Sequence, residues 1–241
     1  MWALSIYKPL MYKHIFFDLD HTLWDFEQNS KDALIEIFEE FKLHEKLACS
    51  FGEFMEVYHV INHDYWDKYK NGKVEREALR NGRFIDTFAH FKNEDISKAI
   101  LISGVYIQRS PYKKQLFEGA IRVLDYLKNK GYFLHIITNG FNEVQYIKLT
   151  ESGLLPYFNT ITTSEHAGHN KPHDKIFNHA LNQAAALKEE SLMIGDNFEA
   201  DVQGAIEAGI NAIWFNPLKE EIKSNLNFQT IHHLLEIETL L

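Results

Sequence analysis

Short apolar runs of the kind found in buried strands alternate with helix-like runs along much of this chain. Four strand-like runs follow residue 130, and they cover residues 133–137, 160–163, 191–194 and 212–215. Apolar residues at helical spacing lie among them, at Leu116, Ala120, Val123 and Leu127, at Ile176, Ala180, Ala184 and Leu187, and at Val202 and Ile206. This alternation predicts an α/β fold with a doubly wound parallel sheet.

Residues 25–111 have a different character, because no convincing strand interrupts their helical pattern. Two apolar faces at helical spacing support this interpretation, one formed by Phe84, Phe88 and Phe91 and the other by Ile96, Ile100 and Ile107. We therefore expect a helical domain at residues 25–111, inserted into an α/β core made of residues 11–24 and 112–241. An insert that begins beside residues 18 to 20 would cover that loop as a lid.

Composition excludes several classes of partner. Lys and Arg number 25 and Asp and Glu number 34, which gives a net charge of −9. A chain this acidic is a poor binder of nucleic-acid polymers and of anionic membrane surfaces. Cys49 is the only cysteine, so no intramolecular disulfide can form, which favours a reducing, cytoplasmic location. No apolar run approaches the length of a membrane span, and we expect a monomer or a weak homo-oligomer.

Two carboxylates follow the first apolar run, which ends at Phe17. In a strand, residues two apart point to the same side, so Asp18 and Asp20 can face one reaction centre. One carboxylate could then attack while the other moves a proton, as covalent phosphoryl transfer requires. By itself the pair is equally compatible with a solvated turn.

Polar residues also follow later strand-like runs, where open α/β sheets place their ligands. Thr138 and Asn139 could hold phosphate oxygens, although alone they would read as an ordinary turn. Lys171 lies in a polar loop and could stabilise negative charge. Asp196 adds a carboxylate that with Asp18 would suit Mg²⁺, and Asp201 is placed to support it.

These four segments, in this order, resemble the four motifs of the haloacid dehalogenase superfamily. The motifs here are Asp18-Leu19-Asp20-His21-Thr22, the strand-end Thr138, Lys171, and the loop from Gly195 to Asp201. The resemblance implies a Rossmann-like core with a helical cap and Mg²⁺ as cofactor. It makes Asp18 the nucleophile and a Mg²⁺ ligand, Asp20 the general acid and base with its carbonyl on the metal, and Asp196 a further ligand. It also implies that Thr138 and Asn139 bind the transferring phosphoryl group and that Lys171 stabilises charge.

Three details refine the comparison with this superfamily. His21 stands where many relatives have glycine, and it could restrict the turn or face the substrate. Asp20 favours a phosphate monoester as substrate, because an ester oxygen benefits from a proton as it leaves. The insert resembles the cap of the bacterial nucleoside 5′-monophosphate phosphatase branch, in which Tyr65, Trp66 and Tyr69 could stack on a base. At helical spacing the same aromatic residues could instead form lid core.

Three alternatives remain open. A sugar-phosphate phosphatase or phosphomutase would share all four motifs, and Arg76, Arg80 and Arg83 could supply a second phosphate site. A zinc site is another class, because His59 and His63 are four residues apart and His166, His169 and His173 surround Lys171. A non-catalytic binding protein is the third, and the intact Asp18 and Lys171 argue against it.

Overall fold

The computed structural model describes residues 12–241, and it divides into two compact units. One unit holds residues 12–24, 116–142 and 154–241, and the other holds residues 25–115 and 143–153. The second unit thus includes residues 143–153, which the sequence prediction placed in the α/β core. The predicted domain roles, and the lid over residues 18 to 20, stay predictions.

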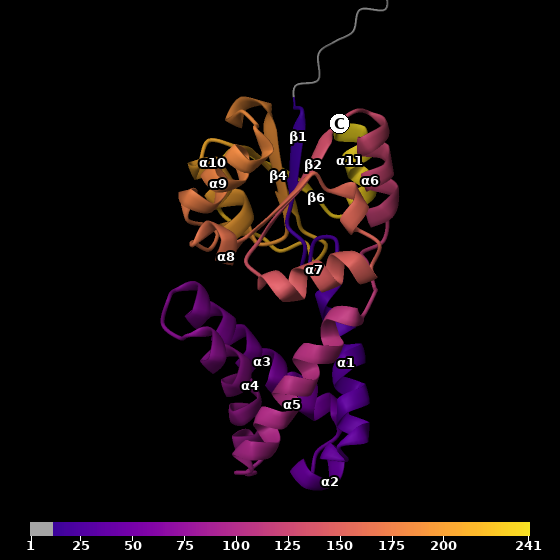
Figure 1. The fold of residues 1–241 in the computed structure, drawn as a ribbon, viewed down its shortest axis with the longest axis vertical. Coiled ribbons are helices and arrows are strands. Elements are labelled where there is room, and N and C mark those ends of the chain that lie inside the picture. The colour runs from indigo at the N-terminus through magenta and orange to yellow at the C-terminus, as the bar shows by residue number, and fades with distance from the viewer. Residues whose placement is uncertain (1–11) are drawn as a thin grey trace, which may run out of the picture. The chain divides into compact units, whose positions relative to one another are not determined.

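The first unit contains a six-stranded sheet in which every neighbouring pair is parallel, with the order β3-β2-β1-β4-β5-β6 (Figure 1). The strands are β1 (His14–Phe17), β2 (Phe133–Thr138), β3 (Thr160–Thr163), β4 (Ser191–Gly195), β5 (Asn211–Phe215) and β6 (Gln229–Ile231). The predicted α/β class with a doubly wound parallel sheet is confirmed. Strand β6 was not predicted.

Helices lie on both faces of this sheet (Figure 1). They are α6 (Ala120–Asn129), α8 (Ser164–Ala167), α9 (Asp174–Ala184), α10 (Gly204–Glu207) and α11 (Ile237–Leu240), and a π-helical turn spans Phe198–Gln203. One core cluster joins Phe16, Met193 and Trp214 of the sheet to Ile176 and Phe177 of α9. Such fully buried apolar side chains each contribute about 1.5–3 kcal/mol to folding.

The second unit is helical. It contains α1 (Phe26–Glu40), α2 (Leu43–Leu47), α3 (Phe51–Lys70), α4 (Arg76–His90), α5 (Ile96–Arg109) and most of α7 (Asn142–Glu151). Its core is aromatic and includes Phe54, Tyr58, Phe84, Phe88 and Tyr106. A capping box of Ser50 and Glu53 begins α3.

Ile96, Ile100 and Ile107 lie on helix α5 as expected, but Ile96 and Ile100 are about half exposed because α5 packs through Ala99, Ile102 and Tyr106. One local prediction was wrong. Leu116 is not helical, since it pairs with Trp24 in an isolated bridge and α6 begins only after Gly119, whose φ is +84°. Among the described residues, no helix is both long and apolar enough to cross a membrane.

Candidate active site

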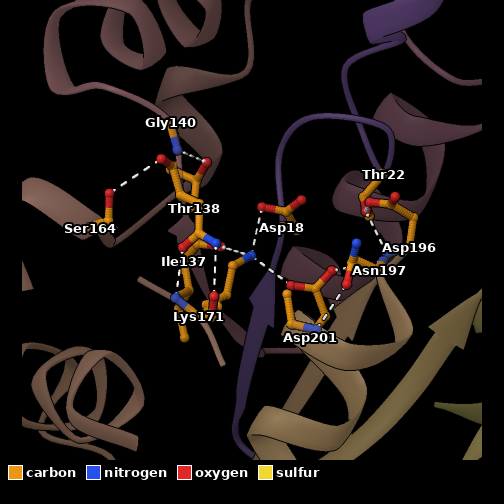
Figure 2. A network of polar contacts seen from close by, with 12 residues as sticks. Asp18, Thr22, Ile137, Thr138, Gly140, Ser164, Lys171, Asp196, Asn197 and Asp201 are labelled. Atoms are coloured by element: carbon orange, nitrogen blue, oxygen red, sulfur yellow. Dashed lines mark hydrogen bonds and ion pairs between the residues drawn. The ribbon is translucent and has the colours of Figure 1, made fainter. Parts of the chain in front are cut away.

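The predicted site residues converge at the carboxyl edge of the sheet. Phe17 at the end of β1 pairs with Ile136 of β2 and with Ile194 of β4, so these three strands end at one level. The strand order reverses direction beside β1, and this switch point is where open α/β sheets bind ligands. Asp18, Thr138 and Asp196 follow or end these strands, and Figure 2 shows them around one centre.

Lys171 is the cation of this centre and is only 2% exposed. Its ammonium group contacts Asp18 Oδ1 at 2.8 Å and Asp201 Oδ1 at 2.6 Å, and donates to the carbonyl of Ile137 at 2.7 Å (Figure 2). The contacts with Asp18 and Ile137 are hydrogen bonds, and the contact with Asp201 is an ion pair. Burial alone would lower the pKa of Lys171, but the two carboxylates outweigh it and raise that pKa above its usual value. Lys171 therefore stays charged.

Three carboxylates lie together beside this lysine. Oxygen atoms of Asp18, Asp196 and Asp201 lie within 4.8 Å of one another. Burial raises the pKa of Asp18 well above its usual range, against the opposing charge of Lys171. Burial and the charge of Asp201 raise the pKa of Asp196 to about 7. When ionised, the three carboxylates carry more charge than Lys171 can balance, and a divalent cation bound by oxygen ligands would neutralise the excess.

Glycine is required beside Asp201. A Cβ atom on Gly195 would lie 2.3 Å from the Asp201 carboxylate, closer than real Cβ contacts. Asp201 folds back over this glycine and accepts a hydrogen bond from the backbone N–H of Asn197 at 3.0 Å. Asp201 thus contacts Lys171 and the loop that carries Asp196, and its supporting role stays a prediction.

Thr22 links the first and last motifs. Its hydroxyl donates to Asp196 Oδ1 at 2.9 Å and accepts from the Asp196 backbone N–H at 3.1 Å (Figure 2). Thr22 belongs to the first motif, but the sequence alone predicts no role for it. Asp20, half-exposed in the same loop, pairs through its backbone with Trp24 in an isolated bridge.

The strand-end residues of β2 are engaged with their surroundings. The Thr138 hydroxyl accepts a hydrogen bond from the backbone N–H of Gly140 at 3.1 Å. The Asn139 side chain is bonded to the backbone of Lys171 in both directions, at 2.7 and 3.0 Å. The side-chain amide of Asn139 is thus occupied by the Lys171 backbone. We therefore expect Asn139 to contact a phosphoryl group through its backbone N–H.

His21 adopts a left-handed conformation, with φ of 62°. Glycine adopts this conformation without steric cost, whereas residues with a Cβ atom are strained in it. The turn therefore requires the conformation that glycine suits, and His21 is accommodated there with its backbone N–H on the Trp24 carbonyl at 3.0 Å.

The aromatic residues of α3 have partners within the helical unit. The Tyr65 ring lies so close to α4 that a Cβ on Gly82 would be 2.4 Å from its hydroxyl oxygen. That hydroxyl donates to Asp86 at 2.8 Å, and burial and this bond raise the pKa of Tyr65 to about 12. Trp66 and Tyr69 contact each other edge to face at 5.9 Å. Tyr65 thus serves α3–α4 packing, and base stacking by these three residues stays a prediction.

The arginines of α4 do not form one exposed anion site. Arg76 and Arg80 both pair with Glu143 of α7, and Arg83 is buried and donates to Asn62 at 2.7 Å. Among residues 12–241, no group of three metal-ligating side chains includes a histidine. Neither the second phosphate site nor a zinc site gains support.

Comparison with known proteins agrees with this geometry. Residues 15–215 match the family described as haloacid dehalogenase-like hydrolase. A pyrimidine 5′-nucleotidase of Streptococcus pneumoniae is 33% identical, over 96% of this chain and 94% of that protein. A pyrimidine 5′-nucleotidase of Escherichia coli is 32% identical, over 94% of this chain and 96% of that protein.

A solved structure is similar as well. The magnesium-bound crystal structure of the hydrolase YfnB from Bacillus subtilis superposes with a TM-score of 0.84 at 29% identity, and covers 95% of this chain and 98% of that chain. Its fold is the one described here, with a parallel sheet and a helical unit. The chain belongs to the haloacid dehalogenase-like hydrolase family.

Proposed function

We propose that this protein is a Mg²⁺-dependent phosphatase that hydrolyses nucleoside 5′-monophosphates, with a phosphoryl group passing through Asp18. The observation that carries the proposal is the buried Lys171, which holds Asp18 and Asp201 at the sheet edge where Thr138 also lies. A charged lysine there lowers the repulsion between a carboxylate nucleophile and an anionic ester.

The reaction has two steps. An Asp18 oxygen attacks phosphorus while Asp20 donates a proton to the leaving ester oxygen. Asp20 then takes a proton from water, which attacks the phosphorus of the aspartyl-phosphate and releases phosphate and free Asp18. Thr138 and the backbone of Asn139 bind the phosphoryl oxygens, and Lys171 stabilises their charge.

Asp18, Asp196 and the backbone carbonyl of Asp20 would hold Mg²⁺. The excess negative charge of the buried carboxylates supports this assignment, and so does the magnesium found in the similar YfnB structure. When bound, the ion supplies charge neutralisation between the carboxylates and the phosphoryl oxygens. Asp201 stays outside this ligand set and holds Lys171.

The nucleoside monophosphate assignment rests on two similar pyrimidine 5′-nucleotidases and on the resemblance of the cap. Trp66 and Tyr69 remain the aromatic candidates for a base, because both are half-exposed. A small sugar phosphate is the second candidate substrate, since the motifs would treat any monoester alike.

The experiment is phosphate release with Mg²⁺ from pyrimidine and purine nucleoside 5′-monophosphates and from sugar phosphates. We expect kcat/KM to be at least about tenfold higher for pyrimidine nucleotides, which corresponds to about 1.4 kcal/mol of discrimination. An Asp18→Asn variant and added EDTA should each abolish release. Preference for sugar phosphates would refute the substrate assignment, and an isomerised sugar phosphate without free phosphate would indicate a mutase.

A further inference from the structure

Trp214 lies directly beside the loop that carries the last acidic motif. It is a residue of β5, it pairs in register with Gly195 of β4, and it is 4% exposed. Its indole N–H donates to the backbone carbonyl of Asp196 at 2.7 Å. The indole N–H is the one hydrogen-bond donor of a tryptophan side chain, and here Asp196 accepts from it.

Asp196 is therefore held from two directions. Thr22 binds its backbone N–H and one carboxylate oxygen, Oδ1, while Trp214 binds its carbonyl. The bond from Thr22 goes to Oδ1, so Oδ2 is the other oxygen of this carboxylate that can face a cation. Because the backbone N–H, the carbonyl and Oδ1 of Asp196 are all held, the direction of Oδ2 is set as well.

The Trp214 ring contacts the same loop a second time. It packs edge to face against Phe198 at 5.4 Å, and Phe198 packs against Phe228 at 5.2 Å. Phe198 begins the π-helical turn that contains Asp201. Trp214 thus contacts Asp196 and the first residue of the turn that carries Asp201.

We propose that Trp214 is a positioning residue that orients Asp196 for Mg²⁺, so that loss of its N–H weakens metal binding. This inference rests on the Mg²⁺ site of the proposed function. A buried carbonyl that loses its donor is costly, and the peptide can turn to find another partner. Turning it would carry the Asp196 carboxylate away from the acidic cluster, and partners behind a metal ligand commonly set metal affinity.

The test is calorimetric titration of Mg²⁺ into wild-type protein and a Trp214→Phe variant, which keeps an aromatic ring but lacks the donor. A Phe228→Leu variant is the matched control, because it disturbs the same aromatic cluster without touching the Asp196 hydrogen bond. A second form of the protein carries at position 214 a tryptophan analogue with sulfur in place of the ring nitrogen. This analogue removes the N–H donor and keeps nearly the same side-chain volume. It therefore separates the loss of the hydrogen bond from the packing defect that Trp214→Phe also introduces.

We expect the Mg²⁺ dissociation constant to rise about tenfold in both donor-free proteins and to stay within about twofold of wild type in Phe228→Leu. Where turnover is measured, kcat at saturating Mg²⁺ should stay near the wild-type value, so the defect lies in affinity. Unchanged affinity in the analogue protein, or an equal loss in Phe228→Leu, would overturn the proposal. The titration needs no substrate, so failure of the assigned phosphatase activity would be seen separately.

Discussion

Removing the buried cation should destabilise the protein in a way that depends on pH. In a Lys171→Met variant, the buried carboxylates of Asp18 and Asp201 would lose their positively charged partner, with Asp196 close by. Breaking a buried ion pair by removing one partner costs about 3–5 kcal/mol. We therefore expect the free energy of unfolding at pH 8, without Mg²⁺, to fall by about that amount.

The sign of the pH dependence follows from the raised pKa values of Asp18 and Asp196. A carboxyl group whose pKa is higher in the folded protein contributes stability at pH values below its unfolded pKa of about 3.9. That contribution disappears as the pH rises through the folded value, which is about 7 for Asp196. Without Lys171 both pKa values should rise further, so the variant should recover stability between pH 8 and pH 5.

The assay is urea denaturation followed by far-ultraviolet circular dichroism at pH 8 and pH 5. Lys13→Met is the control, because Lys13 pairs with Glu190 on the surface, and its loss should cost less than about 1 kcal/mol at either pH. A Lys171→Met protein as stable as wild type at pH 8, or one that loses more stability toward pH 5, would refute this reasoning.

Three further predictions concern single residues. Gly195→Ala should lower Mg²⁺ affinity or turnover at least about tenfold, because the new methyl group displaces Asp201. The control is Gly104→Ala in a helix, where a Cβ meets no atom within 4 Å and should add up to about 1 kcal/mol of stability. Equal losses of Mg²⁺ affinity and turnover in the two variants would contradict this prediction. His21→Gly should raise the free energy of unfolding by up to about 1 kcal/mol, and a fall would show that the imidazole makes a stabilising contact. Burial lowers the pKa of His135 to about 3, so between pH 7 and pH 5 this histidine takes up a proton only in the unfolded chain. The free energy of unfolding should therefore fall by about 2 kcal/mol as the pH is lowered over this range. Denaturation of His135→Gln should lack that loss, and an unchanged pH dependence would count against it.

The sequence predicted the strands that carry the site because each is a short apolar run with polar residues at its end. It missed β6, since Gln229–Ile231 offers only three residues, of which two are exposed, and its pairing depends on β5. The apolar spacing indicated that α5 is helical, but periodicity does not show which of its faces the neighbouring helices bury.

At the site, the order of the motifs along the chain was sufficient to group Asp18, Thr138, Lys171 and Asp196. The carboxyl ends of parallel strands lie at the same edge of the sheet, so residues that directly follow different strands lie close together in space. The contacts of Thr22 and Trp214 with Asp196 were not predictable in this way, because they depend on the reach and rotamer of side chains across neighbouring strands.

Covalent transfer to Asp18 is the central claim, and trapping the intermediate tests it most directly. An Asp20→Asn variant cannot activate water, so with Mg²⁺ and p-nitrophenyl phosphate, whose leaving group needs no proton, it should accumulate the aspartyl-phosphate. Intact-protein mass spectrometry after a rapid quench should show one added phosphoryl group, which is absent when Asp18→Asn is added to the same variant. Release of p-nitrophenol without any phosphorylated protein, or phosphorylation that persists without Asp18, would contradict the account.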